Sequence, residues 1–175
     1  MPEFSLKPLE EAVRKAAASA LNKIAARLIT AISRYLRGHY NILKRDLDKQ
    51  FYIERATSNN PTASILVSGE KLSLVAFNAK QTDEGVQVII IKGKPVTIKN
   101  VFMGTKRVGA LGSIGSTDVF QRKGRERLPI KLITGPDIAS LARSREVSAL
   151  IKKTFYTDWE KVFQSELRYY RSRTR

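Results

Sequence analysis

The residues that could support catalysis in this sequence are few, and their spacing completes no familiar site. Gly135-Pro136-Asp137 could open a nuclease site, in which two carboxylates hold a metal ion and a lysine orients water. That site requires a second acid followed two residues later by lysine, and no acid further along the chain has this neighbour. We therefore expect Gly135 to end a strand, Pro136 to begin a helix and Asp137 to favour that helix's N-terminus.

Three other patterns also lack the partners that chemistry would need. Gly109, Gly112 and Gly115 have neither the Gly-Lys-Ser/Thr ending of a phosphate-binding loop nor the strand and helix of a dinucleotide site. His39, the single histidine, follows a helix-ending glycine, where a capping or surface role is expected. The chain has no cysteine, which excludes disulfides and thiolate chemistry. We expect a protein that is not an enzyme and that uses no cofactor or metal ion.

Basic residues are the strongest chemical signal. The net charge is +16, with 32 basic and 16 acidic residues, which favours encounter with nucleic acid, an acidic protein or an anionic membrane. Basic side chains can hold phosphates without reading base sequence, although a solvated surface with ion pairs to neighbours is the alternative. The candidates for contact with DNA or a partner are Lys106, Arg107, Arg122, Lys123, Arg125, Arg127, Arg168, Arg171, Arg173 and Arg175.

Two long helices are predicted at the two ends of the chain. Apolar residues recur at steps of three or four over residues 6–37, and Gly38 is expected to end this helix. Its alanine-rich middle would let another helix approach closely. A second stripe after Pro136 ends in a basic tail. The residues of the two stripes are Leu6, Leu9, Val13, Ala17, Leu21, Ile24, Leu28, Ile32 and Tyr35, then Val147, Ile151, Phe155, Trp159, Val162, Phe163, Leu167 and Tyr170.

Between the helices the pattern changes to short β-branched and aromatic runs. After a short helix at residues 41–50, strands are predicted for FYIERAT, ASILVSG, LSLVAFN and GVQVIIIKG, and for residues 95–103 and 128–133. The glycine-rich residues 104–116 are expected to form a loop. The prediction is an α+β fold with a central antiparallel β-sheet or small sandwich and both helices on one face. It forms one domain over residues 1–175: helix 1–38, mainly β region 39–135, and helix with basic tail 136–175.

The sequence gives no sign of a membrane protein. It has no apolar run of about 18 residues, and its N-terminus carries acids at Glu3, Glu10 and Glu11 without a compact apolar core. We therefore expect no membrane span and no secretory signal. We expect the protein to be made in a reducing cytoplasm.

Several segments, taken in order, resemble the minor tail protein Z family of lambda-like tailed phages and prophages, also called tail completion proteins. They are YNILKRDLDKQFYIERAT, SGEKLSLVAFNAKQTDEGVQVII, VFMGT, VFQRKGRERLPIKLITGPDIASL and the late helix with its aromatic-basic tail. The resemblance runs from residues 41–50 to the C-terminus, and the N-terminal helix matches in character more than in letters.

The resemblance implies a structural virion protein of the tail or neck, assembled in the host cytoplasm and without enzymatic activity. Its members act at the head-proximal end of the tail tube, where a ring around the DNA path is expected, sixfold to match the tube. The implied partners are copies of itself, the tail terminator, tail tube or head–tail connector proteins, and DNA. The resemblance assigns no individual binding residue.

We hypothesise that residues 104–116 and the QRKGRER turn, residues 121–127, face the lumen of this ring or an adjoining ring. One alternative is a free, sequence-nonspecific nucleic-acid-binding protein. It is disfavoured because Phe51, Tyr52, Phe77 and Phe102 are expected in the core and not on a basic surface. Another alternative is a different neck component, such as a terminator or stopper.

Overall fold

The structure, a computed structural model, describes residues 7–108, 113–126 and 128–173. It confirms the predicted α+β class, with long helices near both ends of the chain and antiparallel sheets between them. The elements are α1 (Lys7–His39), α2 (Lys44–Asp48), β1 (Phe51–Glu54), β2 (Ser64–Val67), β3 (Lys71–Ser73), the 3-10 helix η1 (Leu74–Phe77), β4 (Lys80–Thr82), β5 (Gly85–Ile91), β6 (Lys94–Lys99), β7 (Val101–Val108), β8 (Ser113–Arg122), β9 (Ile130–Asp137), α3 (Ile138–Ala142) and α4 (Arg145–Ser172).

The chain divides into two compact units. The helical unit comprises Met1–Arg34, Phe51–Val67 and Ala142–Arg175, and the β unit comprises Tyr35–Gln50 and Ser68–Leu141. Helix α1 runs from the first unit into the second. The single domain expected from the sequence stays a prediction.

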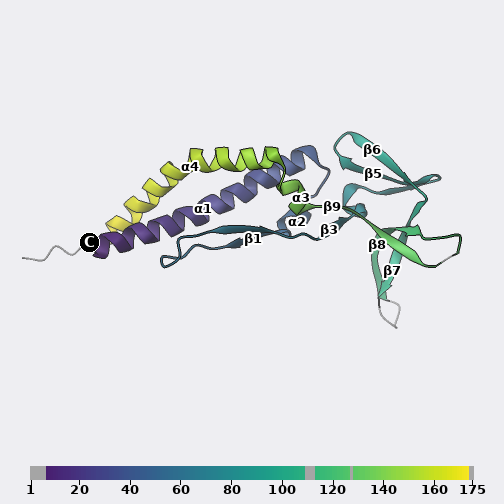
Figure 1. Cartoon of the computed structure of the whole chain (residues 1–175), viewed down its shortest axis with the longest axis horizontal. Coiled ribbons are helices and arrows are strands. Elements are labelled where there is room, and N and C mark those ends of the chain that lie inside the picture. Colours follow the sequence, from purple (N-terminus) through teal and green to yellow (C-terminus); the bar gives the residue numbers. More distant parts are fainter. Residues whose placement is uncertain (1–6, 109–112, 127, 174–175) are drawn as a thin grey trace, which may run out of the picture. The chain divides into compact units, whose positions relative to one another are not determined.

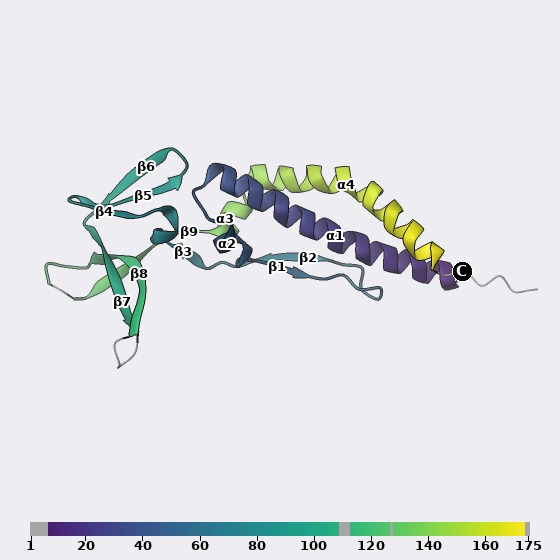
Figure 2. The ribbon, with the colours of Figure 1, turned by 180° about the vertical axis from the view of Figure 1, so that it is seen from behind.

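In the helical unit, α1 and α4 lie side by side, and the β1–β2 hairpin runs along α1 (Figures 1 and 2). Their shared core contains Ala20, Ile24 and Leu28 of α1 and Val162 of α4. Around this core pack Ile65 of β2 and the half-buried α4 residues Ile151, Phe155, Trp159 and Phe163. The apolar stripe predicted for the C-terminal helix therefore does contribute to a core.

Polar contacts fix the same three elements against one another. The carboxylate of Glu166 on α4 accepts hydrogen bonds from Ser19 Oγ at 2.6 Å and Lys23 Nζ at 2.5 Å on α1. The amide of Asn22 donates to Ala56 O at 2.9 Å and accepts from Ala56 N at 2.8 Å, which ties α1 to the segment after β1. These contacts satisfy groups that would otherwise be buried without partners.

The predicted apolar stripe is wrong over the first turns of α1. Leu9 and Val13 are exposed, whereas Ala12, Ala16 and Ala20 are buried. Small side chains let neighbouring backbones come close, so the alanine face packs and the larger residues point outward. The helix also continues through Gly38 to His39.

In the β unit, two antiparallel sheets have the strand orders β3-β9-β8-β7 and β4-β5-β6. Their core includes Phe77, Val86, Val88 and Val119, which have no solvent exposure. The predicted strand LSLVAFN is wrong in its second half, because it forms η1, which contacts β5, β8 and β9. The Ser73 side chain accepts from Val75 N and caps η1.

Two further expectations for the β unit are wrong. Residues 104–108 and 113–116 are not a loop but belong to strands β7 and β8, which pair as an antiparallel hairpin. Gly135 does not end a strand and Pro136 does not begin a helix, because both lie in β9, which runs to Asp137, and α3 begins at Ile138. The expectation for Asp137 is confirmed, because its Oδ1 accepts from Ser140 N at 2.6 Å.

Candidate interaction surfaces

The QRKGRER turn joins β8 to β9 in the β unit. A backbone hydrogen bond from Lys123 N to Pro129 O at 3.1 Å closes this turn, and the side chains of Arg122, Lys123 and Arg125 are exposed. The guanidinium of Arg122 lies 5.2 Å from the ring centroid of Phe102 on β7. Arg127 lies outside the described residues. The turn therefore presents a basic tip beside an aromatic side chain.

Lys106 and Arg107 lie near the other end of the same sheet, on β7, and their side chains are outside the described part of the structure. The backbone of Arg107 pairs with Ile114 of β8, which is eight positions before Arg122. At about 3.3 Å per residue, these two places are about 26 Å apart along β8. Lys106 and Arg107 therefore do not form one cluster with Arg122 and Lys123, because most of the length of β8 lies between them.

The C-terminal basic residues belong to the helical unit. Arg168 and Arg171 lie near the end of α4, and Arg173 follows the helix directly. The guanidinium of Arg173 lies 4.9 Å from the ring centroid of Tyr169, an aromatic residue that is itself half exposed. Arg175 is outside the described residues. This end of α4 therefore offers one cation held over an aromatic ring, that of Arg173 over Tyr169.

One face of the sheet β3-β9-β8-β7 carries an apolar row that the sequence analysis missed. Antiparallel register places Phe102, Phe120 and Leu132 opposite one another on three neighbouring strands. Directly opposite residues share a sheet face, and Ile130 shares it with Leu132 because side chains alternate. We call Phe102, Phe120, Ile130 and Leu132 the apolar face. The alternation of Leu128, Ile130 and Leu132 was the sequence signal for it.

The apolar face is only partly covered. Leu132 is 42% exposed and Ile130 is 38% exposed, whereas Phe120 is only 7% exposed. A Cβ atom at Gly104 would lie 3.3 Å from the Phe120 ring and 3.5 Å from the Phe102 ring. Both rings therefore lie over this glycine, while Ile130 and Leu132 stay accessible.

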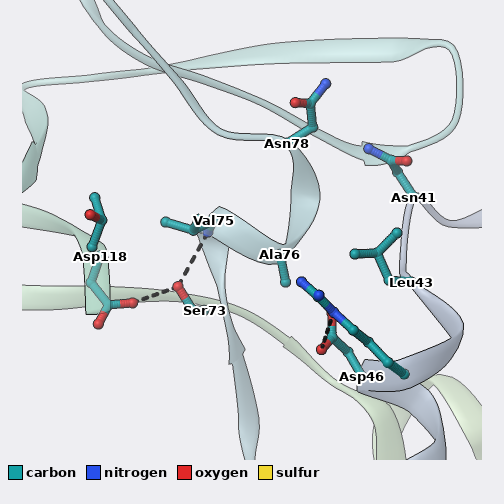
Figure 3. A pocket seen from close by; sticks show the side chains of 10 residues that line it. Asn41, Leu43, Asp46, Ser73, Val75, Ala76, Asn78 and Asp118 are labelled. Atoms are coloured by element: carbon teal, nitrogen blue, oxygen red, sulfur yellow. Dashed lines mark hydrogen bonds and ion pairs between the residues drawn. The ribbon is translucent and has the colours of Figure 1, made fainter. Parts of the chain in front are cut away.

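An open cleft of about 620 Å³ also lies in the β unit (Figure 3). The Ser73 hydroxyl donates to Asp118 Oδ1 at 2.5 Å and accepts from Val75 N at 3.2 Å. The Ser73 hydroxyl is therefore held between the Asp118 carboxylate and the first turn of η1, which it caps. The cleft is lined by Asn41, Leu43, Arg45, Asp46, Ser73, Val75, Ala76, Asn78, Thr117 and Asp118.

The perturbed carboxylates have structural explanations. Hydrogen bonds from the Ser140 backbone and hydroxyl lower the pKa of Asp137 below its usual value. Burial would raise the pKa of Glu166, but hydrogen bonds from Lys23 and Ser19 outweigh it and leave the pKa lowered. His39 Nδ1 lies 3.0 Å from Tyr35 O on its own helix. Within the described residues, no group of three or more His, Cys, Asp or Glu could hold a metal ion.

Four aromatic residues were expected in the core, and this expectation is confirmed for two of them. Phe51 and Phe77 are buried, whereas Phe102 is half-buried in the apolar face. Tyr52 is 60% exposed, so its assignment to the core is wrong. Tyr52 lies on the exposed side of β1, because strand alternation places Phe51 and Ile53 on the other, more buried side.

The described residues thus form an α+β fold that carries an exposed basic turn and a partly exposed apolar sheet face. The family model described as Prophage minor tail protein Z (GPZ) matches residues 5–173, and the chain belongs to this family. It is therefore a structural protein of phage tails, which places it in the virion among other virion proteins and indicates a non-enzymatic role. The comparisons find no matching curated protein and no matching solved structure. Among the described helices, none is long and apolar enough to cross a membrane.

Proposed function

We propose that the protein is a tail completion component that forms a ring around the DNA path at the head-proximal end of the tail. The observation that carries this proposal is the net charge of +16 in a chain of a phage tail family. A subunit beside a passing polyanion must tolerate and guide it without reading its sequence, and exposed arginine and lysine side chains do this.

The ring consists of copies of this chain, six if it matches the symmetry of the tube. Its neighbours are the tail terminator, the tail tube or the head–tail connector, and its task is to make the tail competent to join a DNA-filled head. The basic tip formed by Arg122, Lys123 and Arg125 supports a contact with DNA or with an adjoining ring.

Charge reversal at this tip tests the proposal. In phage particles, replacing Arg122, Lys123 and Arg125 with glutamate should leave unattached tails and filled heads while the isolated protein stays folded. A matched control replaces with glutamate three exposed lysines of the same unit: Lys80 and Lys94 on the other sheet and Lys92 in the turn between β5 and β6. Normal infectious yield from the tip variant, or equal loss from the control, would contradict a role for this tip in head–tail joining.

Imaging of intact virions tests the location independently. A ring of this chain at the head–tail junction agrees with the proposal, and a position elsewhere in the tail contradicts it.

Residues at the end of α4, such as Tyr169 with Arg173 over its ring, also suit sequence-nonspecific binding of single-stranded nucleic acid by the free protein. Salt-sensitive binding by the isolated chain that is lost in Tyr169→Ala would favour that second function.

A further inference from the structure

The apolar face and the basic tip lie next to each other in one sheet. Arg122, the last residue of β8, pairs with Ile130 in the register of β8 and β9. Its guanidinium reaches the ring of Phe102 in the same face. The surface therefore combines partly exposed aliphatic side chains with a rim of positive charge, a combination that marks a docking site more than a solvated surface.

The chemistry of this surface selects among three kinds of occupant. Duplex DNA offers phosphates to the rim, but its apolar base faces are stacked inside, so it leaves Ile130 and Leu132 without partners. A second copy of this chain that docked through the same surface would bring two basic tips together, which like-charge repulsion disfavours. An acidic protein segment with apolar side chains satisfies both parts of the surface at once.

We propose that the apolar face and the adjoining basic tip dock an acidic, amphipathic segment of a different virion protein. The apolar row crosses three strands, a width of about 10 Å, which matches the diameter of one helix with its side chains. Apolar side chains of that segment cover Ile130 and Leu132, and its carboxylates face Arg122, Lys123 and Arg125. The inference rests on the chain's being a virion protein. It gives a partner to the basic tip, to which the proposed function assigns a contact.

Photo-crosslinking in assembled particles tests this partner directly. The full chain carries a photoreactive phenylalanine analogue at position 132, at position 130 as a second site, and at position 96 as a control. Val96 is 56% exposed on β6 and lies outside the apolar face. The expected result is a crosslink from positions 132 and 130, well above that from position 96, to a segment of another virion protein that has negative charge and apolar residues.

Three crosslinking results would overturn the inference: a crosslink to another copy of this chain, a crosslink to DNA, or a yield from positions 132 and 130 no higher than from 96. A ring found elsewhere in the tail would contradict the proposed function without removing the crosslink, so the two failures are distinguishable.

The affinity of the Leu132→Ser variant for the partner identified by the crosslink supplies a second measurement. We expect affinity for a synthetic peptide of that segment to fall about threefold to tenfold, because Leu132 is 42% exposed and the peptide can bury only this remaining part of the side chain. Val96→Ser should bind like the wild type. Unchanged affinity in Leu132→Ser, with circular dichroism showing a folded protein, would also overturn the inference.

Discussion

Replacing Glu166 with glutamine should destabilise the helical unit. The Glu166 side chain is 9% exposed and accepts hydrogen bonds from Ser19 and Lys23. Hydrogen bonds to a charged group contribute about 1.5–3 kcal/mol, but Lys23 is 56% exposed, so solvent screens part of this ion pair. Glutamine keeps one acceptor oxygen and removes the charge. We therefore expect the free energy of unfolding to fall by about 1 kcal/mol at pH 7.

The assay is urea unfolding followed by tryptophan fluorescence. Trp159 is the only tryptophan of the chain, and its ring lies between those of Phe155, at 5.6 Å, and Phe163, at 5.3 Å. Because these residues pack on the core shared by α1 and α4, the fluorescence reports unfolding of the helical unit. The control is Asp158→Asn, which removes a more exposed ion pair with Arg27 between the same helices and should cost less than 1 kcal/mol.

The pH dependence gives the sharper test. Because the pKa of Glu166 is lower in the folded protein than in the unfolded chain, the unfolded chain binds the proton first as the pH falls. The contribution of Glu166 is therefore complete above the usual glutamate pKa of about 4.3 and is lost as the pH falls through the lowered folded value. The difference between wild type and Glu166→Gln should shrink over that range. Equal stability at pH 7, or a difference that does not change with pH, would refute the reasoning.

Two further changes test other contacts. Asn22→Ala should lower the free energy of unfolding by about 1–3 kcal/mol, because it leaves the buried Ala56 N–H and C=O without their side-chain partner. Hydrogen exchange at the Ala56 amide should become faster in this variant. Unchanged exchange would contradict the assignment of these hydrogen bonds. Gly135→Ala places a Cβ 2.5 Å from the buried Phe77 ring and should destabilise the β unit by about 1–3 kcal/mol, measured by thermal unfolding with circular dichroism. Gly124→Ala, where nothing lies within 4 Å of the added Cβ, is its control, and equal melting temperatures for the two variants would contradict this packing.

The sequence alone determined features that depend on near neighbours. Helical spacing predicted both long helices, and composition indicated a strongly basic chain with one histidine and no cysteine. The order of loose motifs indicated the family to which the chain belongs. Each of these signals lies within a continuous stretch of residues, so no knowledge of pairing between distant segments was needed.

Only the tertiary structure decided which residues meet. The first turns of α1 bury Ala12, Ala16 and Ala20 and expose Leu9 and Val13, because the choice of packed face depends on α4 and the β1–β2 hairpin. LSLVAFN has strand-forming residues, yet tertiary contacts with three strands accompany the 3-10 helix η1.

The candidate surfaces show the same difference between what the sequence and what the tertiary structure determine. Sequence predicted basic contacts, but strand register separated Lys106 and Arg107 from the QRKGRER turn and placed Ile130 and Leu132 beside Phe102 and Arg122. Residue type is a property of the chain itself. Register depends on hydrogen bonds between strands that are far apart in sequence, and a shift of one residue would turn each side chain to the other face. The positive charge of the surface thus follows from the sequence alone. Its apolar face forms only because β7, β8 and β9 pair in this register.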